Sequence, residues 1–578
     1  MTDFAAPIHR RLTARAPEPP RAEANARHDW RLMLLILAFL LFYAAVAGRM
    51  AWMALSDPVE PRLGATSPAE PVRGAITDRA GRLIAANLPA WSLYAHPSDV
   101  LNPVQTAARL GEILPDMEAD EILALLTSRR KFVWIKRPIT PRQKAAIQDL
   151  GNPGLLFGAR DLRLYPPGPE VAHVVGGVQA EREAVRYAAL RGQGGVERFF
   201  DRRLSDPALS GEPLALSLDL SVQAALRDVL ETERRRTSAI GAAGVLMRVQ
   251  TGEVIALVSL PDFDPNRPRR APDRAAGKSP RFNRAVQGLY ELGSVFKPLT
   301  VAMALERGLV APQTLIDTRG PLRVGRQRIN DDHPLRSPAT VTDIIRKSSN
   351  VGTGRIARMV TAAGLQADLR KLGFGEPVPI ELAEAPRVDP LWPPKWREIS
   401  TLTVSFGHGI AVSPLHLAAA YATLGNGGMR VRPTLVKGGV EREAERVFSE
   451  RTARRVLDML RLVVTDGTGR RAAVEGYEIG GKTGTADKPR ENGRGYDHTR
   501  TIATFASVFP VSRPEYVLVV SMDEPTDRSG RRPSRQASRT AAPAVAAAVR
   551  RIAPILGMAP REREIEMPGE ALPAGVPR

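Results

Sequence analysis

Ser294-Val295-Phe296-Lys297 is the stretch from which the fold of this chain can be worked out. Residues 298–305, which follow it, are mostly apolar and lead to Gly308, a pattern that predicts a helix opening at Gly293-Ser294. Pro298 fits the first turn of that helix, where proline is tolerated. Ser294 and Lys297 then lie one turn apart on the same face, so that the hydroxyl and the amine can touch. A first-turn serine also keeps an unpaired backbone N–H, which can help to hold an oxyanion.

Two later stretches, Ser348-Ser349-Asn350 and Lys482-Thr483-Gly484-Thr485, extend this set of groups. The first adds a second hydroxyl and an amide, and the second places a cation beside two hydroxyls on a predicted strand. Each motif alone is a weak signal, because short patterns recur by chance in a chain of 578 residues. Their order, with 54 residues from 294 to 348 and 132 from 350 to 482, makes the combination specific. Together they predict a serine acyltransferase whose base is not a histidine.

Lysine usage supports particular roles for Lys297 and Lys482. Only 11 of the 82 basic residues are lysine, yet both motif positions carry one. Arginine cannot give up its proton in a protein, whereas burial can lower the pKa of a lysine by several units from about 10.4. Lys297 is therefore expected to be the general base, and the compact ammonium of Lys482 suits recognition of a carboxylate.

With these motifs the chain resembles the class B penicillin-binding proteins, which are monofunctional transpeptidases. The resemblance runs from the apolar N-terminal segment to about residue 555. The run Tyr290-Glu291-Leu292-Gly293-Ser294 is more similar to the division-specific member than to the elongation-specific one. Leu292 and Val295 depart from the proline and threonine that are common in the family, and neither change removes a catalytic group. Further similar stretches are Arg73-Gly74-Ala75-Ile76-Thr77-Asp78-Arg79-Ala80-Gly81, Tyr165-Pro166, Ala172-His173, Gly194-Gly195-Val196-Glu197, Asp262-Phe263-Asp264-Pro265-Asn266, Gly407-His408-Gly409-Ile410-Ala411-Val412-Ser413-Pro414 and Asn426-Gly427-Gly428.

The resemblance implies an α/β (α+β) fold, with a β-lactamase-like serine transpeptidase domain built on an antiparallel sheet flanked by helices. It implies D,D-transpeptidation, in which Ser294 attacks the penultimate D-Ala of a stem peptide and Lys297 takes its proton. Ser348 would pass a proton to the leaving nitrogen, and Asn350 would orient Lys297 and a substrate amide. The N–H groups of Ser294 and Thr485 would form the oxyanion hole. The substrate would be bound by Lys482, Ser349, Thr483, Gly484 and Thr485.

The resemblance also implies partners. These are peptidoglycan stem peptides ending in D-Ala-D-Ala, β-lactams that acylate the same serine, a membrane-embedded glycan polymerase and other division proteins. No cofactor or metal is expected. The alternatives are an elongation-specific class B transpeptidase, a carboxypeptidase or β-lactamase, and a catalytically silent division scaffold. A large non-catalytic module argues against the hydrolases, and the complete set of catalytic side chains argues against the scaffold.

Length and composition place further limits on the chain. At 578 residues it exceeds a single core, and without cysteine it can form neither disulfides nor thiolate metal sites. The formal charge of +20 is spread along the sequence without a nucleic-acid motif or a basic stripe with interleaved aromatics. We therefore expect no nucleic-acid partner.

The N-terminus predicts the compartment. Residues 32–48 form an uncharged and mostly apolar run, about 26 Å long as a helix, which can span a bilayer between Trp30 and Trp52. A cleaved signal peptide is the alternative, since Ala45-Val46-Ala47 mimics a cleavage site. We expect a cytoplasmic tail (1–31), a transmembrane anchor (32–55) and a catalytic part on the periplasmic side of a bacterial inner membrane.

The exported part is expected to hold two domains and a tail. Residues 56–213 mix short strands, a helix near 119–128 and many prolines, which indicates a mixed α+β pedestal of the dimerisation type. Residues 214–555 form the transpeptidase domain, which begins with a helix near Asp219. Strands at 243–249 and 254–259 are expected to join those at 477–486, 501–509 and 516–522 in one antiparallel sheet, with K-T-G on an edge strand. The charged, proline-rich residues 556–578 are expected to be a disordered tail.

Overall fold

The chain consists of two units in the computed structural model, Met1–Glu70 and Pro71–Arg578. The structure describes residues 21–55, 73–180, 190–267, 279–439, 445–490 and 495–561. The predicted cytoplasmic tail is described only from residue 21, and residues 562–578 of the predicted C-terminal tail lie outside the described residues.

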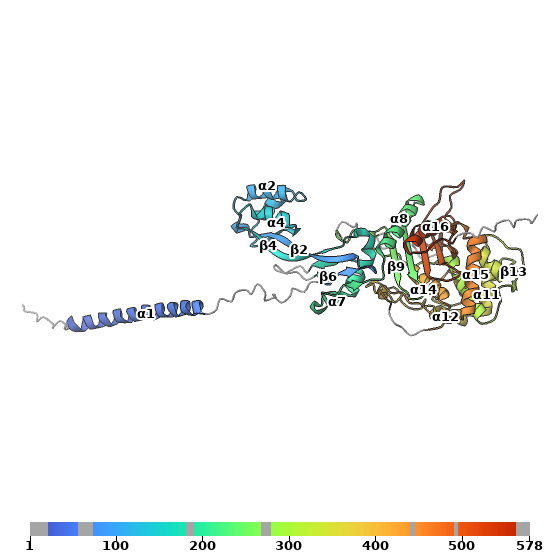
Figure 1. Cartoon of the computed structure of the whole chain (residues 1–578), viewed down its shortest axis with the longest axis horizontal. Coiled ribbons are helices and arrows are strands. Elements are labelled where there is room, and N and C mark those ends of the chain that lie inside the picture. The colour runs from blue at the N-terminus through green and yellow to red at the C-terminus, as the bar shows by residue number, and fades with distance from the viewer. Residues whose placement is uncertain are drawn as a thin grey trace, which may run out of the picture. The chain divides into compact units, whose positions relative to one another are not determined.

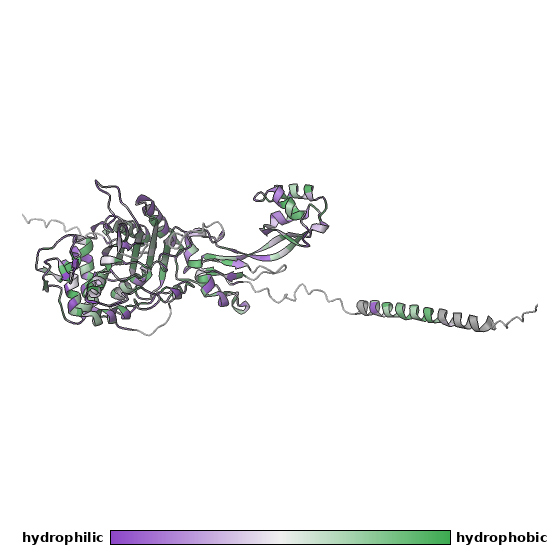
Figure 2. Cartoon of the chain, turned by 180° about the vertical axis from the view of Figure 1, so that it is seen from behind, coloured by the Kyte–Doolittle hydropathy of each residue, from purple (hydrophilic) through white to green (hydrophobic). Residues whose placement is uncertain are grey.

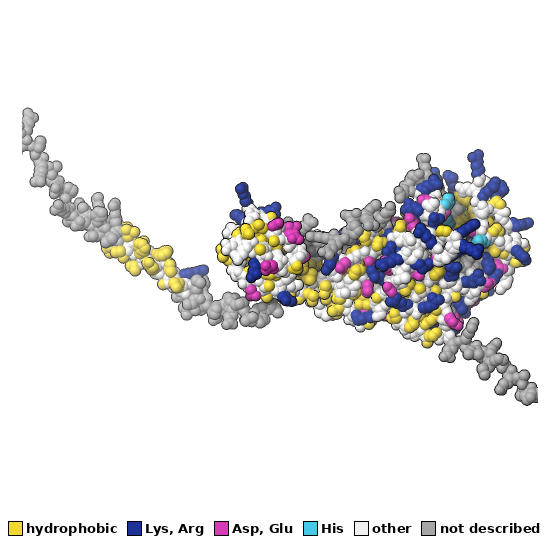
Figure 3. Space-filling model, turned by 90° about the horizontal axis from the view of Figure 1, so that it is seen from above, with side chains coloured by type: hydrophobic (Ala, Val, Ile, Leu, Met, Phe, Trp, Pro, Cys, Tyr) yellow, Lys and Arg dark blue, Asp and Glu magenta, His cyan; other side chains and the backbone are white. Residues whose placement is uncertain are grey.

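The first unit contains one long helix, α1 (Arg21–Leu55). Its window Met33–Met50 has a mean hydropathy of 2.1, and none of this window is buried in the protein. The window appears as a continuous hydrophobic band in Figure 3. Within the described residues this is the one helix long and apolar enough to cross a membrane, and it coincides with the predicted anchor.

The pedestal is built on a long, paired ribbon of strands (Figure 1). Its sheet has the order β3-β2-β1-β7, and β4 also pairs with β2. The far half of β2 carries a small lobe whose core, including Leu93, Leu110 and Ile139, is separate from the rest of the protein. The elements of the ribbon and lobe are β1 (Ile76–Thr77), β2 (Leu83–Ala95), α2 (Pro103–Ile113), α3 (Ala119–Leu126), β3 (Val133–Ile139), α4 (Pro141–Gln148), β4 (Leu155–Leu164) and β7 (Leu214–Ala215).

The base of the pedestal shares its core with the serine domain. Strand β7 pairs in parallel with β1, and Ile76, Val174 and Leu214 belong to the same buried cluster as Val245 of the central sheet. The shared cluster explains why residues 71–578 form one compact unit. The base also contains α5 (Ala172–Val175), β5 (Val178–Ala180), β6 (Leu190–Gly192), α6 (Gly195–Phe199) and α7 (Asp201–Leu204).

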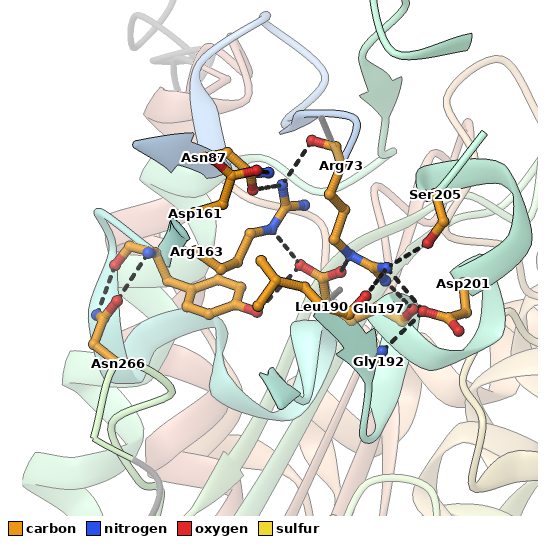
Figure 4. A network of polar contacts seen from close by, with 11 residues as sticks. Arg73, Asn87, Asp161, Arg163, Leu190, Gly192, Glu197, Asp201, Ser205 and Asn266 are labelled. Carbon is orange, nitrogen blue, oxygen red and sulfur yellow. Dashed lines mark hydrogen bonds and ion pairs between the residues drawn. The ribbon is translucent and has the colours of Figure 1, made fainter. Parts of the chain in front are cut away.

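A buried ion-pair network fixes the start of the second unit to this base (Figure 4). Glu197, which is fully buried, accepts hydrogen bonds from Arg73 Nε at 2.7 Å and from Arg163 Nε at 2.8 Å. Tyr165 donates its hydroxyl hydrogen to the same carboxylate at 3.1 Å. The backbone N–H of Tyr165 in turn donates to Asn266 Oδ1 of the serine domain at 2.9 Å. Segments distant in sequence therefore converge on one carboxylate.

The serine domain has the antiparallel sheet that the sequence predicts. The strand order is β14-β15-β16-β8-β9, so strands from both ends of the domain meet and the strand with K-T-G lies at the edge. Alternate side chains of β16 point to opposite faces: Val517 and Val519 enter one core, and Leu518 and Val520 enter the other. The strands are β8 (Gly241–Arg248), β9 (Val254–Leu260), β14 (Gly480–Pro489), β15 (Tyr496–Phe509) and β16 (Tyr516–Asp523).

Helices cover both faces of this sheet. On one face lie α8 (Leu220–Arg236), which starts at the N-cap Asp219 as predicted, and α16 (Ala541–Ile555). On the other face lie α14 (Pro414–Gly425), α15 (Glu450–Asp466) and α9 (Lys297–Glu306). Figure 2 shows the hydrophobic strands between these layers. The remaining helices of the domain are α10 (Val341–Lys347), α11 (Asn350–Val360), α12 (Ala362–Lys371) and α13 (Glu398–Val404).

The chain stays packed beyond α16. Leu556 and Met558 lie against the core beneath α8 and α16, and Arg561 forms an ion pair with Glu478. The first residues of the predicted tail are therefore attached to the domain, because their apolar side chains cover its surface.

Candidate active site

All three motif stretches meet at one cavity of about 610 Å³. Two other cavities of similar volume, 640 and 610 Å³, lie at the base of the pedestal and contain none of the motif residues. The lining of the motif cavity includes Ser294, Ser348, Asn350, Thr483 and Thr485. Within the described residues, no group of three or more His, Asp or Glu side chains is arranged to hold a metal ion.

Ser294 lies in a single 3-10 turn, η5 (Gly293–Phe296), which leads directly into α9. The edge strand β14 approaches this turn so closely that only glycine fits at two positions. A Cβ on Gly293, whose φ is +65°, would lie 2.7 Å from Thr485 O, and a Cβ on Gly484 would lie 2.1 Å from Leu292 O. Gly484, which was expected to bind substrate, packs directly against the serine turn. The close approach places the backbone of Thr485 beside that of Ser294.

Lys297 is completely buried at the start of α9. Its Nζ donates to the carbonyl oxygen of Ser348 at 2.5 Å and lies 3.1 Å from Ser348 Oγ. Burial lowers the pKa of Lys297 to about 7, although Asp331 and Asp332 act in the opposite direction. The expected contact with Ser294 is not made: among the described residues Ser294 Oγ has no hydrogen-bond partner, because the amine is turned toward Ser348.

Lys482, which lies on strand β14, contacts the same Ser348 hydroxyl as Lys297 does. Its Nζ donates to Ser348 Oγ at 2.9 Å and to the carbonyl oxygen of Thr483 at 3.1 Å. Burial, together with the charge of Lys297, holds the pKa of Lys482 well below its usual value. Lys482 is fully buried and faces Ser348, so its ammonium lies behind the cavity wall that Thr483 and Thr485 line.

Ser348 itself has a left-handed backbone conformation, with φ 67° and ψ 45°. It ends α10, and Ser349 begins α11 as its N-cap. Such conformations are uncommon for residues other than glycine and often mark functional sites. The short reversal between two helices lets the Ser348 side chain reach both lysines.

The other two residues of this motif make contacts that the sequence did not predict. Ser349 is 1% exposed, accepts a hydrogen bond from Gly352 N and donates to Asp331 Oδ2 at 2.6 Å, so it caps a helix and is not placed to bind substrate. Asn350 lines the cavity, but its Nδ2 donates to the carbonyl oxygen of Asn330 at 3.0 Å. No hydrogen bond joins Asn350 to Lys297 in the described part of the chain.

Asp331 holds this motif in place, and no sequence pattern pointed to it. Besides the Ser349 hydroxyl, its carboxylate accepts the backbone N–H groups of Asn350 at 2.5 Å and Val351 at 2.9 Å. A carboxylate at a helix N-terminus is favoured by the helix dipole. Asp331 lies in a loop without periodicity, so only the fold shows its role.

The outer rim of the cavity is rich in hydroxyls and cations. Thr483 Oγ1 lies 3.0 Å from Thr468 Oγ1, and Thr485 Oγ1 accepts the backbone N–H of Ala537 at 3.0 Å. Cationic side chains lining the same cavity are Lys347, Arg470 and Arg471. The hydroxyls and cations of this rim can bind an anionic group, and the carboxylates of Asp332 and Asp487 line the same cavity.

A histidine and a carboxylate lie on the other side of the serine turn. His408, which also lines the cavity, has its Nδ1 3.2 Å from Glu291 Oε2. Tyr496 donates to Glu291 Oε1 at 2.9 Å, and its ring packs edge-on against His408. Glu291 and His408 belong to stretches that resemble the family, but the sequence predicted no chemical role for either residue.

Two family models match the chain. Residues 242–549 match the penicillin-binding protein transpeptidase domain, and residues 68–206 match the penicillin-binding protein dimerisation domain. The chain is 35% identical to the probable peptidoglycan D,D-transpeptidase FtsI of Caulobacter vibrioides, over 94% of this chain and 91% of that protein. It is 30% identical to peptidoglycan D,D-transpeptidase FtsI of Escherichia coli, over 89% of this chain and 91% of the relative.

A solved structure shares the fold. Penicillin-binding protein 3 of Mycobacterium tuberculosis, in a complex with aztreonam, aligns with a TM-score of 0.65 at 24% identity, over 85% of this chain and 97% of that one. The transpeptidase match alone covers more than half of the sequence, and a dimerisation domain precedes it in the order found here. With relatives of this kind matching over nearly its whole length, the chain belongs to the class B penicillin-binding proteins.

Proposed function

We propose that this chain is a septal peptidoglycan D,D-transpeptidase that cross-links stem peptides through an acyl-enzyme on Ser294. The observation that carries the proposal is the convergence of Lys297 and Lys482 on Ser348 Oγ, at the inner end of the cavity that contains Ser294. This arrangement supplies a nucleophile, a base of near-neutral pKa and a hydroxyl between two amines.

The first half-reaction uses the neutral form of Lys297. A neutral amine has one lone pair, which can accept the proton of Ser294 while its N–H groups stay on Ser348. Ser294 Oγ then bonds to the carbonyl carbon of the penultimate D-Ala. The proton is passed through Ser348 to the departing nitrogen, and the terminal D-Ala leaves. Asn350, at the cavity wall, is positioned to bind a substrate amide.

Two backbone donors and the rim of β14 complete the site. The N–H groups of Ser294 and Thr485 hold the oxyanion, an effect of about 3 kcal/mol per donor. The hydroxyls of Thr483 and Thr485 bind the carboxylate of the terminal D-Ala. The positive charge of Lys482, which is buried behind these hydroxyls, attracts the same carboxylate. An amine of a second stem peptide then takes the acyl group, which closes the cross-link. β-Lactams mimic the donor and acylate Ser294.

The remaining segments are proposed to place this reaction at the wall. Helix α1 anchors the protein in the inner membrane, with residues 1–31 in the cytoplasm and the rest in the periplasm. Residues 56–213 form the pedestal and residues 214–555 the catalytic domain. We assign to the anchor and pedestal the contact with a membrane-embedded glycan polymerase and other division proteins. The family relationship to FtsI supports this assignment.

Covalent labelling with a fluorescent penicillin tests the catalytic proposal. Ser294→Ala deletes one oxygen that has no partner among the described residues, so the variant is expected to fold and to lose all labelling. The matched control is Ser98→Ala, a change at a serine in the pedestal whose hydroxyl bonds only the neighbouring Asp99. Labelling of Ser294→Ala at the wild-type level would overturn the assignment.

A further inference from the structure

We propose that His408, held by Glu291, accepts a proton from the incoming amine in the second half-reaction. The inference rests on the proposed transpeptidase function and adds the group that prepares the acceptor. Neither residue belongs to the lysine–serine machinery, yet both lie next to the nucleophile.

The backbone fixes His408 beside the serine turn. Gly293 N donates to Gly407 O at 3.1 Å, and a Cβ on Gly407 would lie 2.2 Å from Gly293 O. Gly407 and Gly409 have φ values of +81° and +77°, so the histidine stands between two residues in the left-handed region. This geometry presents the imidazole to the cavity that contains Ser294.

Glu291 sets the orientation of the imidazole ring. Its Oε2 lies 3.2 Å from His408 Nδ1, an ion-pair contact outside hydrogen-bond geometry, and a carboxylate this close favours the tautomer with the hydrogen on Nδ1. The other nitrogen, Nε2, then carries the lone pair, and it has no partner among the described residues. Tyr496 and Phe406 pack edge-on against the ring and hold its plane. A carboxylate beside one imidazole nitrogen, with the other nitrogen unpaired among the described residues, is an arrangement found in general bases.

The second half-reaction needs such a base on the open side of the site. An aliphatic amine with a pKa of about 10.4 arrives almost entirely as an ammonium near neutral pH, and an ammonium cannot attack an ester. Lys297 is completely buried, whereas the His408 side chain is 29% exposed and faces the cavity. Acceptors from solvent can therefore reach His408. Asp332, His333 and Asp487 line the same cavity, and His408 differs from them in being held beside the serine turn by the contact between Gly293 and Gly407.

The acceptor nitrogen loses two protons, and each leaves by a different route. His408 Nε2 takes one proton from the ammonium and later releases it to solvent. The free amine bonds to the acyl carbon, and the bond from that carbon to Ser294 Oγ breaks. The second proton on nitrogen passes through Ser348 and Lys297 to Ser294 Oγ, which restores the starting enzyme.

The two half-reactions can be measured separately on the full-length protein. Fluorescent penicillin reports acylation, and a small acyl-D-alanyl thioester with a D-amino acid as the amine reports transfer. For His408→Gln we expect acylation within about twofold of wild type and transfer to the amine reduced about 100-fold, the usual range for losing a general base. Hydrolysis of the acyl-enzyme should be unchanged. His96→Gln is the matched control, because His96 also faces a carboxylate, Asp99, but lies in the pedestal.

Glu291→Gln tests the positioning role of the carboxylate. The amide keeps the size of the side chain and removes the charge that stabilises the imidazolium. We expect the maximal transfer rate to fall about tenfold, with the KM for the amine and the penicillin acylation rate unchanged. The proposal is overturned if His408→Gln transfers as fast as wild type, or if its acylation falls as much as its transfer. Failure of the wild-type protein to be acylated at all would instead contradict the proposed function.

Discussion

The pH dependence of acylation should report the buried environment of Lys297. The pKa of this amine is lowered to about 7 by burial, and only its neutral form can take the proton of Ser294. With that pKa the neutral fraction is about 0.09 at pH 6 and about 0.9 at pH 8. The second-order rate of acylation by penicillin should therefore rise about tenfold from pH 6 to pH 8 and then level off.

Stopped-time labelling with a fluorescent penicillin across this range provides the measurement. An exposed lysine with an ordinary pKa would instead give a rate that keeps rising tenfold per pH unit up to about pH 10. Either that continued rise or a flat profile would refute the assignment of Lys297 as a base tuned by burial. Lys297→Arg should lose at least about 100-fold at every pH, since a guanidinium cannot accept the proton. Lys437→Arg, at an exposed lysine outside the cavity, provides the control.

Three further outcomes follow from buried groups. Burial lowers the pKa of both His173 and His416 to about 4. Between pH 6.5 and 4 these histidines are therefore protonated in the unfolded chain but neutral in the folded chain. The free energy of unfolding should fall by up to about 3 kcal/mol per histidine as the pH drops through this range. Thermal unfolding at a series of pH values measures this loss, and a melting temperature independent of pH would contradict it. Asp331→Ala should leave a folded protein but reduce the rate of penicillin acylation by about tenfold or more, because the turn at Ser348 loses the carboxylate that holds it in place. A wild-type rate would show that the Ser349 N-cap alone is enough to hold this turn. Glu197→Gln should destabilise the protein by about 3–5 kcal/mol in denaturant unfolding, since buried Arg163 loses its carboxylate partner and Arg73 keeps only that of Asp201 among the described residues. An unchanged midpoint would argue against the network of Figure 4 as a stabilising feature.

Sequence patterns predicted the sheet and its surrounding helices well. Strands at both ends of the serine domain meet in one antiparallel sheet, and K-T-G lies on its edge strand. These strands could be predicted because a strand that is buried on both faces is a continuous run of apolar residues, as in β8 and β9. The pedestal was predicted only as a mixed module, since its lobe and base have different cores that no local pattern separates.

The candidate site was harder to predict in detail. Residue types and spacing indicated the catalytic groups, but the direction of each side chain depends on tertiary contacts. Lys297 turns to Ser348, Ser349 caps a helix and Gly484 relieves a steric clash, and none of these roles is encoded locally. Asp331 and the Glu291–His408 pair come together only through loops that fold back onto the motifs.

The two buried lysines explain why this arginine-rich chain keeps lysine at both positions. Lys297 and Lys482 approach one hydroxyl within 3.1 and 2.9 Å, and the repulsion between two buried charges disfavours the doubly protonated state. An arginine at either position could not release its proton, so that position would carry a permanent charge and could not take part in proton transfer. With lysines, one proton can be absent while the hydroxyl of Ser348 lies between the two amines. In the proposed mechanism the pair is the site at which a proton is taken from Ser294 and passed on, and the burial that lowers the pKa of Lys297 to about 7 makes the base available near neutral pH.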